Sequence, residues 1–105
     1  MVSKHYENQR NQREKFINEH FNDGYIVDEF IVDRGHPNGA ERHCITNNGI
    51  IIVYNANSGK LCTKLLARPQ QIKRYYENSG REPPLEYEKI LKLALEHQIL
   101  GYNNL

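Results

Sequence analysis

The sequence predicts an α+β fold, in which a four-stranded antiparallel meander sheet has an N-terminal helix and two C-terminal helices packed on one face. Short runs rich in Ile, Val and Tyr alternate with turn signals in the middle of the chain, which is typical of hairpin-linked strands. Polar, helix-permissive sequence precedes these runs, and two helical patterns follow them. At 105 residues the chain has room for one domain. Within 1–105 we expect a helical segment over 1–22, the sheet over 25–68 and the helices over 70–100.

The first helix is predicted over residues 4–21, where Phe16 and Ile17 are among the few apolar anchors. Asn22-Asp23-Gly24 follows and favours a helix end, because glycine tolerates the left-handed conformation found there. The run from Tyr25 to Asp33 then predicts the first strand, since it is rich in β-branched and aromatic residues.

Tight turns define the rest of the sheet. Asn47-Asn48-Gly49 is a strong hairpin signal, and Asn57-Ser58-Gly59 supplies a second turn. The expected order is a loop over 34–40 and strands over 42–46, 50–55 and 60–67. Two successive short turns imply antiparallel neighbours, so we expect a meander.

Proline and glycine delimit the two C-terminal helices. Pro69 precedes a short helix over 70–77, and Pro83-Pro84 precedes a longer one over 85–100 that Gly101 follows. Proline at a helix start and glycine just past its end is the favoured order. The apolar residues of the longer helix cover a broad part of its surface, so this helix should pack on the sheet. We expect the opposite face of the sheet to be open and to carry two histidines, a carboxylate and a row of cations.

Charge is distributed unevenly along a chain whose net charge is only +1. From Lys60 to Arg81 there are six cations and one anion, Glu77. Local basicity of this kind indicates a polyanion site better than net charge does. The alternative is an ordinary solvated basic face.

Cysteines and apolar stretches exclude several classes of protein. Cys44 and Cys62 form neither a disulfide framework nor a paired metal-ligand motif, and buried thiols within strands are the simplest interpretation. No apolar stretch approaches the roughly 18 residues that span a bilayer. The N-terminus lacks the apolar core of a signal peptide. We therefore expect a cytoplasmic protein with no membrane partner, no cofactor and no metal.

A cluster of ionisable residues in and after the first loop suits acid–base chemistry on RNA. Glu41 and His43 are two apart on a predicted strand, so their side chains leave the same face. His36 lies on the loop that leads into this strand. RNA is cut without metal when a base takes the 2′-hydroxyl proton, an acid protonates the leaving 5′-oxygen and cations stabilise the phosphate. We expect Glu41 or His36 to act as base and His43 as acid.

Cations and aromatic residues nearby suit RNA binding. Arg68 precedes proline and should be extended, which positions its guanidinium to grip a phosphate, or to form a salt bridge with Asp28, Asp33 or Glu41. Catalytic candidates are thus His36, Glu41, His43 and Arg68, and RNA-binding candidates are Arg34, Thr46, Tyr54, Lys64, Lys73 and Arg74. Thr46 has the opposite parity to His43, so it reaches the same face only through a twist or bulge.

Three segments together resemble a known group of enzymes. They are Val32-Asp33-Arg34-Gly35-His36-Pro37-Asn38-Gly39-Ala40-Glu41-Arg42-His43, the run from Thr46 to Asn55, and the run from Ser58 to Tyr75. This pattern resembles the C-terminal ribonuclease domains of bacterial polymorphic toxins, in the group that unites barnase, EndoU, colicin-type tRNases and RelE-type interferases. The resemblance covers about residues 25–76. It implies metal-independent cleavage by transphosphorylation that leaves a 2′,3′-cyclic phosphate, with His36, Glu41 and His43 in the polar motif.

The function expected from the sequence is therefore a small toxin-type ribonuclease, acting on tRNA or mRNA and partnered by a cognate immunity protein or a host protein. One alternative is a non-catalytic phage or bacterial protein that binds nucleic acid or inhibits a host protein on the same scaffold. Another is an antitoxin or assembly module that pairs through the helix over 85–100.

Overall fold

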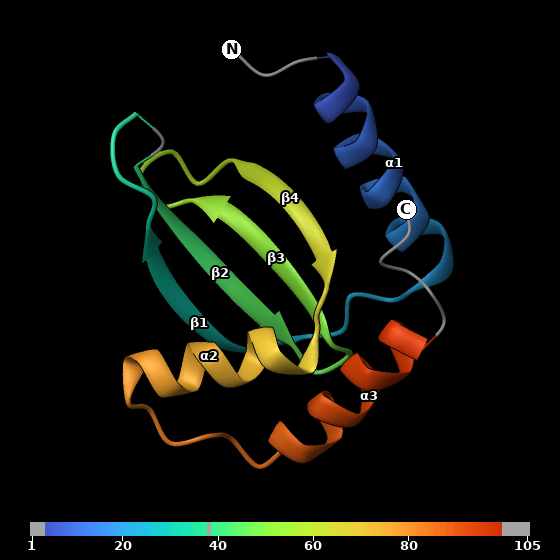
Figure 1. Ribbon diagram of the computed structural model, residues 1–105, viewed down its shortest axis with the longest axis vertical. Coiled ribbons are helices and arrows are strands. Elements are labelled where there is room, and N and C mark those ends of the chain that lie inside the picture. Colours follow the sequence, from blue (N-terminus) through green and yellow to red (C-terminus); the bar gives the residue numbers. More distant parts are fainter. Residues whose placement is uncertain (1–3, 38, 100–105) are drawn as a thin grey trace.

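The fold predicted from the sequence is confirmed by a computed structural model that describes residues 4–37 and 39–99 (Figure 1). In chain order the elements are α1 (Lys4–His20), β1 (Ile26–Asp33), β2 (Ala40–Thr46), β3 (Ile50–Asn55), β4 (Leu61–Leu66), α2 (Pro69–Ser79) and α3 (Tyr87–Ile99). Predicted and observed boundaries agree within two residues. Leu100 and Gly101, where the last helix was expected to end, lie outside the described residues, as do residues 1–3.

The sheet has the strand order β1-β2-β3-β4, with every neighbouring pair antiparallel. The hairpin between β2 and β3 turns through Gly49, whose φ of 77° lies in the left-handed region that glycine adopts without strain. Thr46 closes the same turn, because its Oγ1 accepts hydrogen bonds from the backbone N–H groups of Asn48 (3.3 Å) and Ile50 (3.2 Å). The meander expected from the two turn signals is therefore present.

Helices α2 and α3 cover one face of the sheet. Ile45 of β2 and Ile51 of β3 point to this side and pack with Ile72 of α2 and Ile90 of α3, and all four are fully or almost fully buried. Alternation along each strand places every second side chain on this face. The two C-terminal helices thus share one face, as the sequence predicts.

Helix α1 packs on the other face, which corrects the expectation that this face is open. Ile17 of α1 is fully buried with Cys44 of β2, and with Ile50 and Ile52 of β3. Figure 1 shows α1 beside β4, on the opposite side of the molecule from β1. The polar sequence of α1 gave little sign of this packing, because a few apolar residues are enough to attach the helix.

The C-terminal end of α2 is attached to β1. Tyr76 donates a hydrogen bond from its hydroxyl to Asp28 Oδ2 (2.9 Å), and Arg81 pairs with Asp28 Oδ1 (2.6 Å). The Arg81 guanidinium also lies 4.6 Å from the centre of the Phe30 ring. These contacts hold α2 across the first two strands, where the polar residues of the next section meet.

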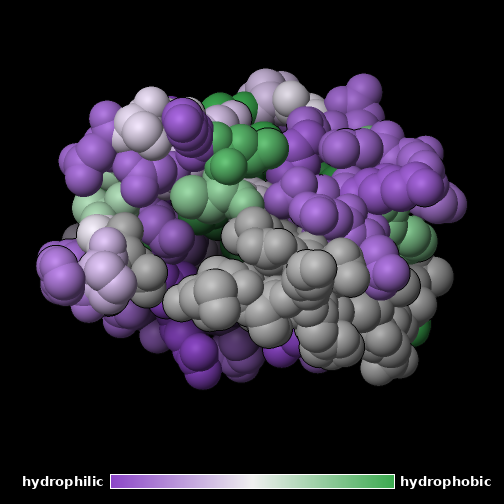
Figure 2. All heavy atoms as spheres, turned by 90° about the horizontal axis from the view of Figure 1, so that it is seen from above, coloured by the Kyte–Doolittle hydropathy of each residue, from purple (hydrophilic) through white to green (hydrophobic). Residues whose placement is uncertain are grey.

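Much of the surface is polar, in keeping with a mean hydropathy of −0.79. Figure 2 shows one end of the molecule, on which hydrophilic residues lie on either side of a small hydrophobic patch. None of the helices within the described residues is long and apolar enough to cross a membrane.

Candidate active site between β1, β2 and α2

Strand β2 presents Glu41 and His43 on the same face of the sheet, as their spacing predicts. His43 lies opposite Phe30 of β1 and Val53 of β3 in the register, and both neighbours belong to the core beneath α2. The imidazole is only 3% exposed. The expectation that these groups occupy an uncovered face is therefore wrong: they lie on the side that α2 covers.

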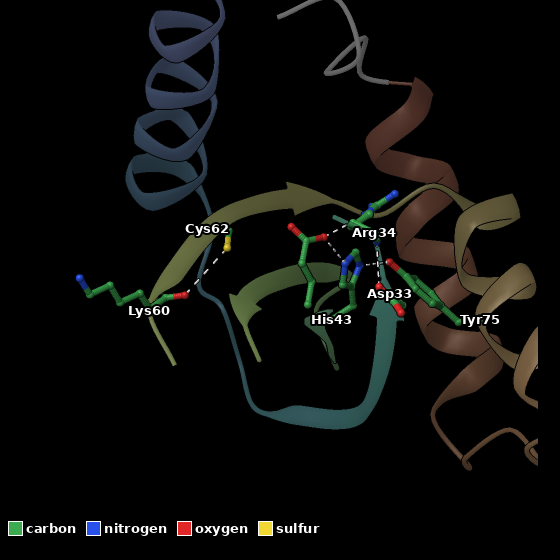
Figure 3. Close-up of polar contacts among 8 residues, drawn as sticks. Asp33, Arg34, His43, Lys60, Cys62 and Tyr75 are labelled. Carbon is green, nitrogen blue, oxygen red and sulfur yellow. Dashed lines mark hydrogen bonds and ion pairs between the residues drawn. The ribbon is translucent and has the colours of Figure 1, made fainter. Parts of the chain in front are cut away.

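Four side chains form a continuous line of polar contacts (Figure 3). Arg34 Nε donates to Glu41 Oε1 at 3.0 Å, and His43 Nε2 lies 3.1 Å from the same oxygen. On the other side of the ring, His43 Nδ1 is 2.6 Å from the hydroxyl oxygen of Tyr75 on α2. The line runs from the β1–β2 loop, through β2, to α2.

The Arg34 end of this line is set by a tight turn. The backbone N–H of Arg34 donates to the carbonyl of Gly39 at 2.9 Å, and that of Gly39 donates to the carbonyl of Gly35 at 2.7 Å. Gly35 and Gly39 have φ values of 72° and 75°, which few other residues adopt. The turn brings Arg34 back beside Glu41 at the start of β2.

Hydrogen-bond chemistry fixes the direction of these contacts. An ionised carboxylate only accepts, so His43 donates through Nε2 to Glu41. In the neutral imidazole, Nδ1 then accepts the hydroxyl proton of Tyr75. In the doubly protonated imidazole, Nδ1 donates to the Tyr75 oxygen instead. Carboxylate, imidazole and phenol thus follow one another in an order that can move a proton.

Glu41 is held as an anion. Burial acts to raise its pKa, but hydrogen bonds from Arg34 and His43 and the positive charge of Arg34 outweigh that effect, and the pKa of Glu41 is lowered. Both hydrogen bonds end on Oε1, and among the described residues none ends on Oε2. With 21% of its side chain exposed, Glu41 keeps one carboxylate oxygen available for a proton.

Tyr75 keeps its proton at neutral pH. Burial raises the pKa of its phenol to about 12, against the opposing effects of a polar contact with Gln71 and the charge of Arg34. The ring stacks on Phe30, with ring centres 5.1 Å apart and planes 19° apart. Tyr75 is therefore a positioned hydroxyl donor.

A pocket of about 390 Å³ opens beside this line; we call it the β1–α2 pocket. Phe30, Ile31 and Val32 form its apolar wall on β1, whereas α2 contributes polar side chains on the opposite wall. The lining residues from α2 are Gln71, Arg74, Tyr75, Asn78 and Ser79, and Arg34 and His43 complete the lining. Arg74 is exposed, and no ion pair involves it among the described residues.

Sequence reasoning found part of this site. Arg34, Glu41, His43 and Arg74 were all predicted, and the structure brings them together. The position of Tyr75 at the end of the line was not predicted. Residues 71, 74, 75 and 78 recur at the spacing of one helix face, which is the signal that could have indicated this side of α2.

Other predicted residues lie elsewhere. Lys64 donates from Nζ to Asp23 Oδ2 (2.7 Å) and to Asn18 Oδ1 (2.9 Å), so its charge is paired with residues of α1 and the loop after it. Thr46 is fully buried and caps the β2–β3 turn. The expectation that Lys64 and Thr46 join the histidines on one surface is therefore wrong, because strand alternation and the β2–β3 turn separate them.

Three more candidates do not line the β1–α2 pocket. His36 is exposed on the β1–β2 loop, and Tyr54 packs on the α1 side of the sheet, where the Arg42 guanidinium lies 5.1 Å from its ring centre. Arg68 adopts the predicted extended conformation, with φ −103° and ψ 148°, immediately before α2. Their roles in catalysis or RNA binding stay predictions.

Neither Cys44 nor Cys62 forms a disulfide. Cys44 is fully buried, and burial together with the nearby Glu29 carboxylate raises the pKa of its thiol. Within the part of the chain that the structure describes, no group of three or more His, Cys, Asp or Glu side chains is arranged to hold a metal ion.

Comparisons of the chain with protein-family models, with curated proteins and with solved structures find no match. The resemblance to toxin ribonucleases therefore stays a prediction, and the function is argued below from the geometry of the site.

Proposed function

We propose that the protein is a small ribonuclease that cuts RNA without a metal ion, by transphosphorylation to a 2′,3′-cyclic phosphate. The observation that carries this proposal is the line of contacts from Arg34 through Glu41 and His43 to Tyr75. Three of these four residues, Arg34, His43 and Tyr75, line a pocket that also contains Arg74. Together these residues supply the three components that the reaction needs: a proton acceptor, a proton donor and cations for the phosphate.

Glu41 is the base in this proposal. Its lowered pKa keeps the carboxylate ionised at neutral pH, and Oε2 is the oxygen without a hydrogen bond among the described residues. The carboxylate takes the proton of the 2′-hydroxyl as that oxygen attacks phosphorus. Arg34, already bonded to Oε1, lies next to the charge that develops on the phosphate.

Tyr75 is the acid, supported by His43. When the imidazole carries two protons, Nδ1–H donates to the Tyr75 oxygen over the 2.6 Å contact, and the phenolic proton is free to face the pocket. As the bond from phosphorus to the 5′-oxygen breaks, that oxygen takes the phenolic proton. The hydrogen bond from His43 then stabilises the phenolate. The Glu41 carboxylate and the Tyr75 phenol contact opposite sides of the imidazole. This separation suits a base and an acid that act on opposite sides of a phosphate.

The pocket suits one nucleotide of the RNA. Its volume of about 390 Å³ is within the usual range for small-ligand sites. The apolar wall on β1 offers hydrophobic contacts for a base, and Arg74 supplies a second guanidinium for phosphate. The toxin-type role, the tRNA or mRNA target and a cognate immunity partner remain predictions from the resemblance.

The test compares cleavage of total tRNA and of an mRNA in EDTA by the wild type, Glu41→Gln and Tyr75→Phe. Each substitution keeps the shape of the side chain and should lower the cleavage rate by about 10²–10⁴-fold, the usual contribution of a positioned acid or base. Lys60→Gln is the matched control, because Lys60 is exposed on the turn before β4 and should not affect cleavage. Circular dichroism confirms that each variant is folded. Intact RNA in both EDTA and magnesium would reject the enzymatic proposal.

A second candidate is a protein that binds RNA at the same pocket and does not cut it. The 3% exposure of His43 favours this reading, because a buried imidazole satisfied on both nitrogens also serves simply to hold β2 and α2 together. Binding that weakens steeply with salt, with no cleavage products, would select this candidate.

A further inference from the structure

A second hollow lies on the far side of α2, between α2 and α3; we call it the α2–α3 groove. Its volume is about 690 Å³, compared with about 390 Å³ for the β1–α2 pocket. Pro69 of α2 and Leu91 and Leu95 of α3 form its apolar lining, and Leu95 is 50% exposed. Several apolar residues together, rimmed by polar ones, are the kind of feature that marks a binding groove.

The rim of this groove is positive. Lys73 of α2 and Lys89 and Lys92 of α3 line it, against a single carboxylate, Glu88. All three lysines are exposed, and none of them forms an ion pair with the residues that the structure describes. Their ammonium groups are therefore available to a partner of opposite charge.

The groove is separate from the β1–α2 pocket. Gln71, Arg74 and Asn78 face the pocket, whereas Pro69 and Lys73 face the groove. At 100° per residue, the outward side of α2 that carries Glu77 lies between these two faces. A ligand in the pocket would have to cross that side, past an exposed carboxylate, to reach the lysines. We therefore expect a ligand of the groove to be different from a ligand of the pocket.

We propose that the α2–α3 groove binds an acidic amphipathic helix of a partner protein. Two packed helices leave a channel into which a third helix lays its apolar side chains, at i, i+3, i+4 and i+7. The apolar lining accepts those side chains, and the lysine rim pairs with carboxylates that flank them. This partner differs from the RNA of the proposed function, and the inference does not depend on catalysis.

Two other occupants fit less well. RNA phosphates would pair only with the lysines of the rim. They would make no favourable contact with the apolar lining of Pro69, Leu91 and Leu95. Insertion into an anionic membrane needs apolar side chains that protrude, whereas Leu91 and Leu95 line a concave surface. Both enter the experiment as competing outcomes.

The experiment uses the full chain and a fluorescein-labelled peptide of about 15 residues, long enough to form a helix. Leucines at i, i+4 and i+7 and flanking glutamates on an alanine background supply the proposed chemistry. We expect saturable binding by fluorescence anisotropy with Kd below about 100 μM. Lys89→Glu together with Lys92→Glu should weaken binding at least about tenfold, as should Leu95→Asp. A peptide with lysine in place of every glutamate should not bind.

The matched control is Lys15→Glu together with Lys60→Glu, which reverses the same amount of charge on exposed positions away from the groove. It should leave the affinity for the acidic peptide unchanged. Absence of saturable binding, or equal loss of binding in the control, would overturn the proposal. The proposal would also be overturned if the protein bound a single-stranded oligouridylate, or phosphatidylcholine vesicles with phosphatidylserine, more tightly than the acidic peptide, and if the Lys89/Lys92 variant lost that binding. Cleavage of RNA is scored separately, so failure here leaves the proposed function untouched.

Discussion

The two faces of the sheet leave their polar side chains exposed to different degrees. On the α2 face, Arg34 contacts Glu41 while half of its side chain, 52%, stays exposed beside a pocket. On the α1 face, Lys64 is 16% exposed and is held by Asp23 at 2.7 Å. Both cations were predicted to bind RNA. The comparison shows that a cation is available for a ligand only where the fold leaves part of it accessible and a hollow next to it.

Strand β2 supplies both faces. Glu41 and His43 turn toward α2, whereas Cys44, the next residue, is buried toward α1. The α1 face uses its polar groups to attach a helix, and the α2 face places them around a pocket. We therefore expect substitutions on the α1 face to affect stability, and substitutions on the α2 face to affect cleavage as well.

The largest expected effect is on the α1 face. Ile17→Ala should lower the free energy of unfolding by about 2–5 kcal/mol, because Ile17 is fully buried between α1 and the sheet. Urea unfolding measures it, with Gln12→Ala on the exposed side of α1 as the control. A loss for Ile17→Ala no larger than that of the control would mean that α1 does not cover this face.

Arg74→Gln is the corresponding test on the α2 face. We expect cleavage to fall by about 10²-fold, since Arg74 lines the pocket and we propose that its guanidinium binds the phosphate. Lys64→Gln should leave the cleavage rate unchanged and lower the free energy of unfolding by no more than about 1 kcal/mol. The opposite result, with Lys64 essential and Arg74 dispensable, would place the substrate on the α1 face.

Thr46→Val tests whether this residue is structural. The substitution keeps the side-chain shape but removes the acceptor for two backbone N–H groups, so the free energy of unfolding should fall by about 1–3 kcal/mol. The cleavage rate per folded molecule should not change. A variant that unfolds like the wild type but binds RNA more weakly would return Thr46 to the RNA-binding set.

A further expected effect appears only at alkaline pH. Folding raises the pKa of Tyr75 from its ordinary value of 10 to about 12, so the folded chain holds this proton more tightly than the unfolded chain does. The resulting stabilisation is complete below pH 10 and is lost as the pH rises toward 12. The measurement is the free energy of unfolding as a function of pH, for the wild type and for Tyr75→Phe. The difference between the two curves isolates Tyr75, because Tyr76 and Tyr87, whose pKa values are also raised, remain in both proteins. A flat difference curve would mean that Tyr75 is not buried against His43.

Local patterns predicted most of the fold and only part of the site. Turn signals such as Asn47-Asn48-Gly49 depend on a few consecutive residues, and strand alternation needs only a spacing of two, so the meander and the shared face of Glu41 and His43 were readable. The contact of His43 with Tyr75 joins residues 32 positions apart, and that of Lys64 with Asp23 joins residues 41 apart. No periodicity encodes such pairs, because they depend on where α2 and α1 dock. The sequence of α1 is so polar that its apolar face could not predict on which side of the sheet the helix packs.

The central claim is that Glu41 and Tyr75, joined through His43, transfer protons at a phosphodiester in the β1–α2 pocket. The most direct measurement is phosphorus NMR of a short oligoribonucleotide incubated in EDTA with the wild type and with Tyr75→Phe. We expect a 2′,3′-cyclic phosphate signal to grow with the wild type, and to grow at least about 10²-fold more slowly with the variant. No cyclic phosphate with the folded wild type, or equal rates for the two proteins, would contradict it.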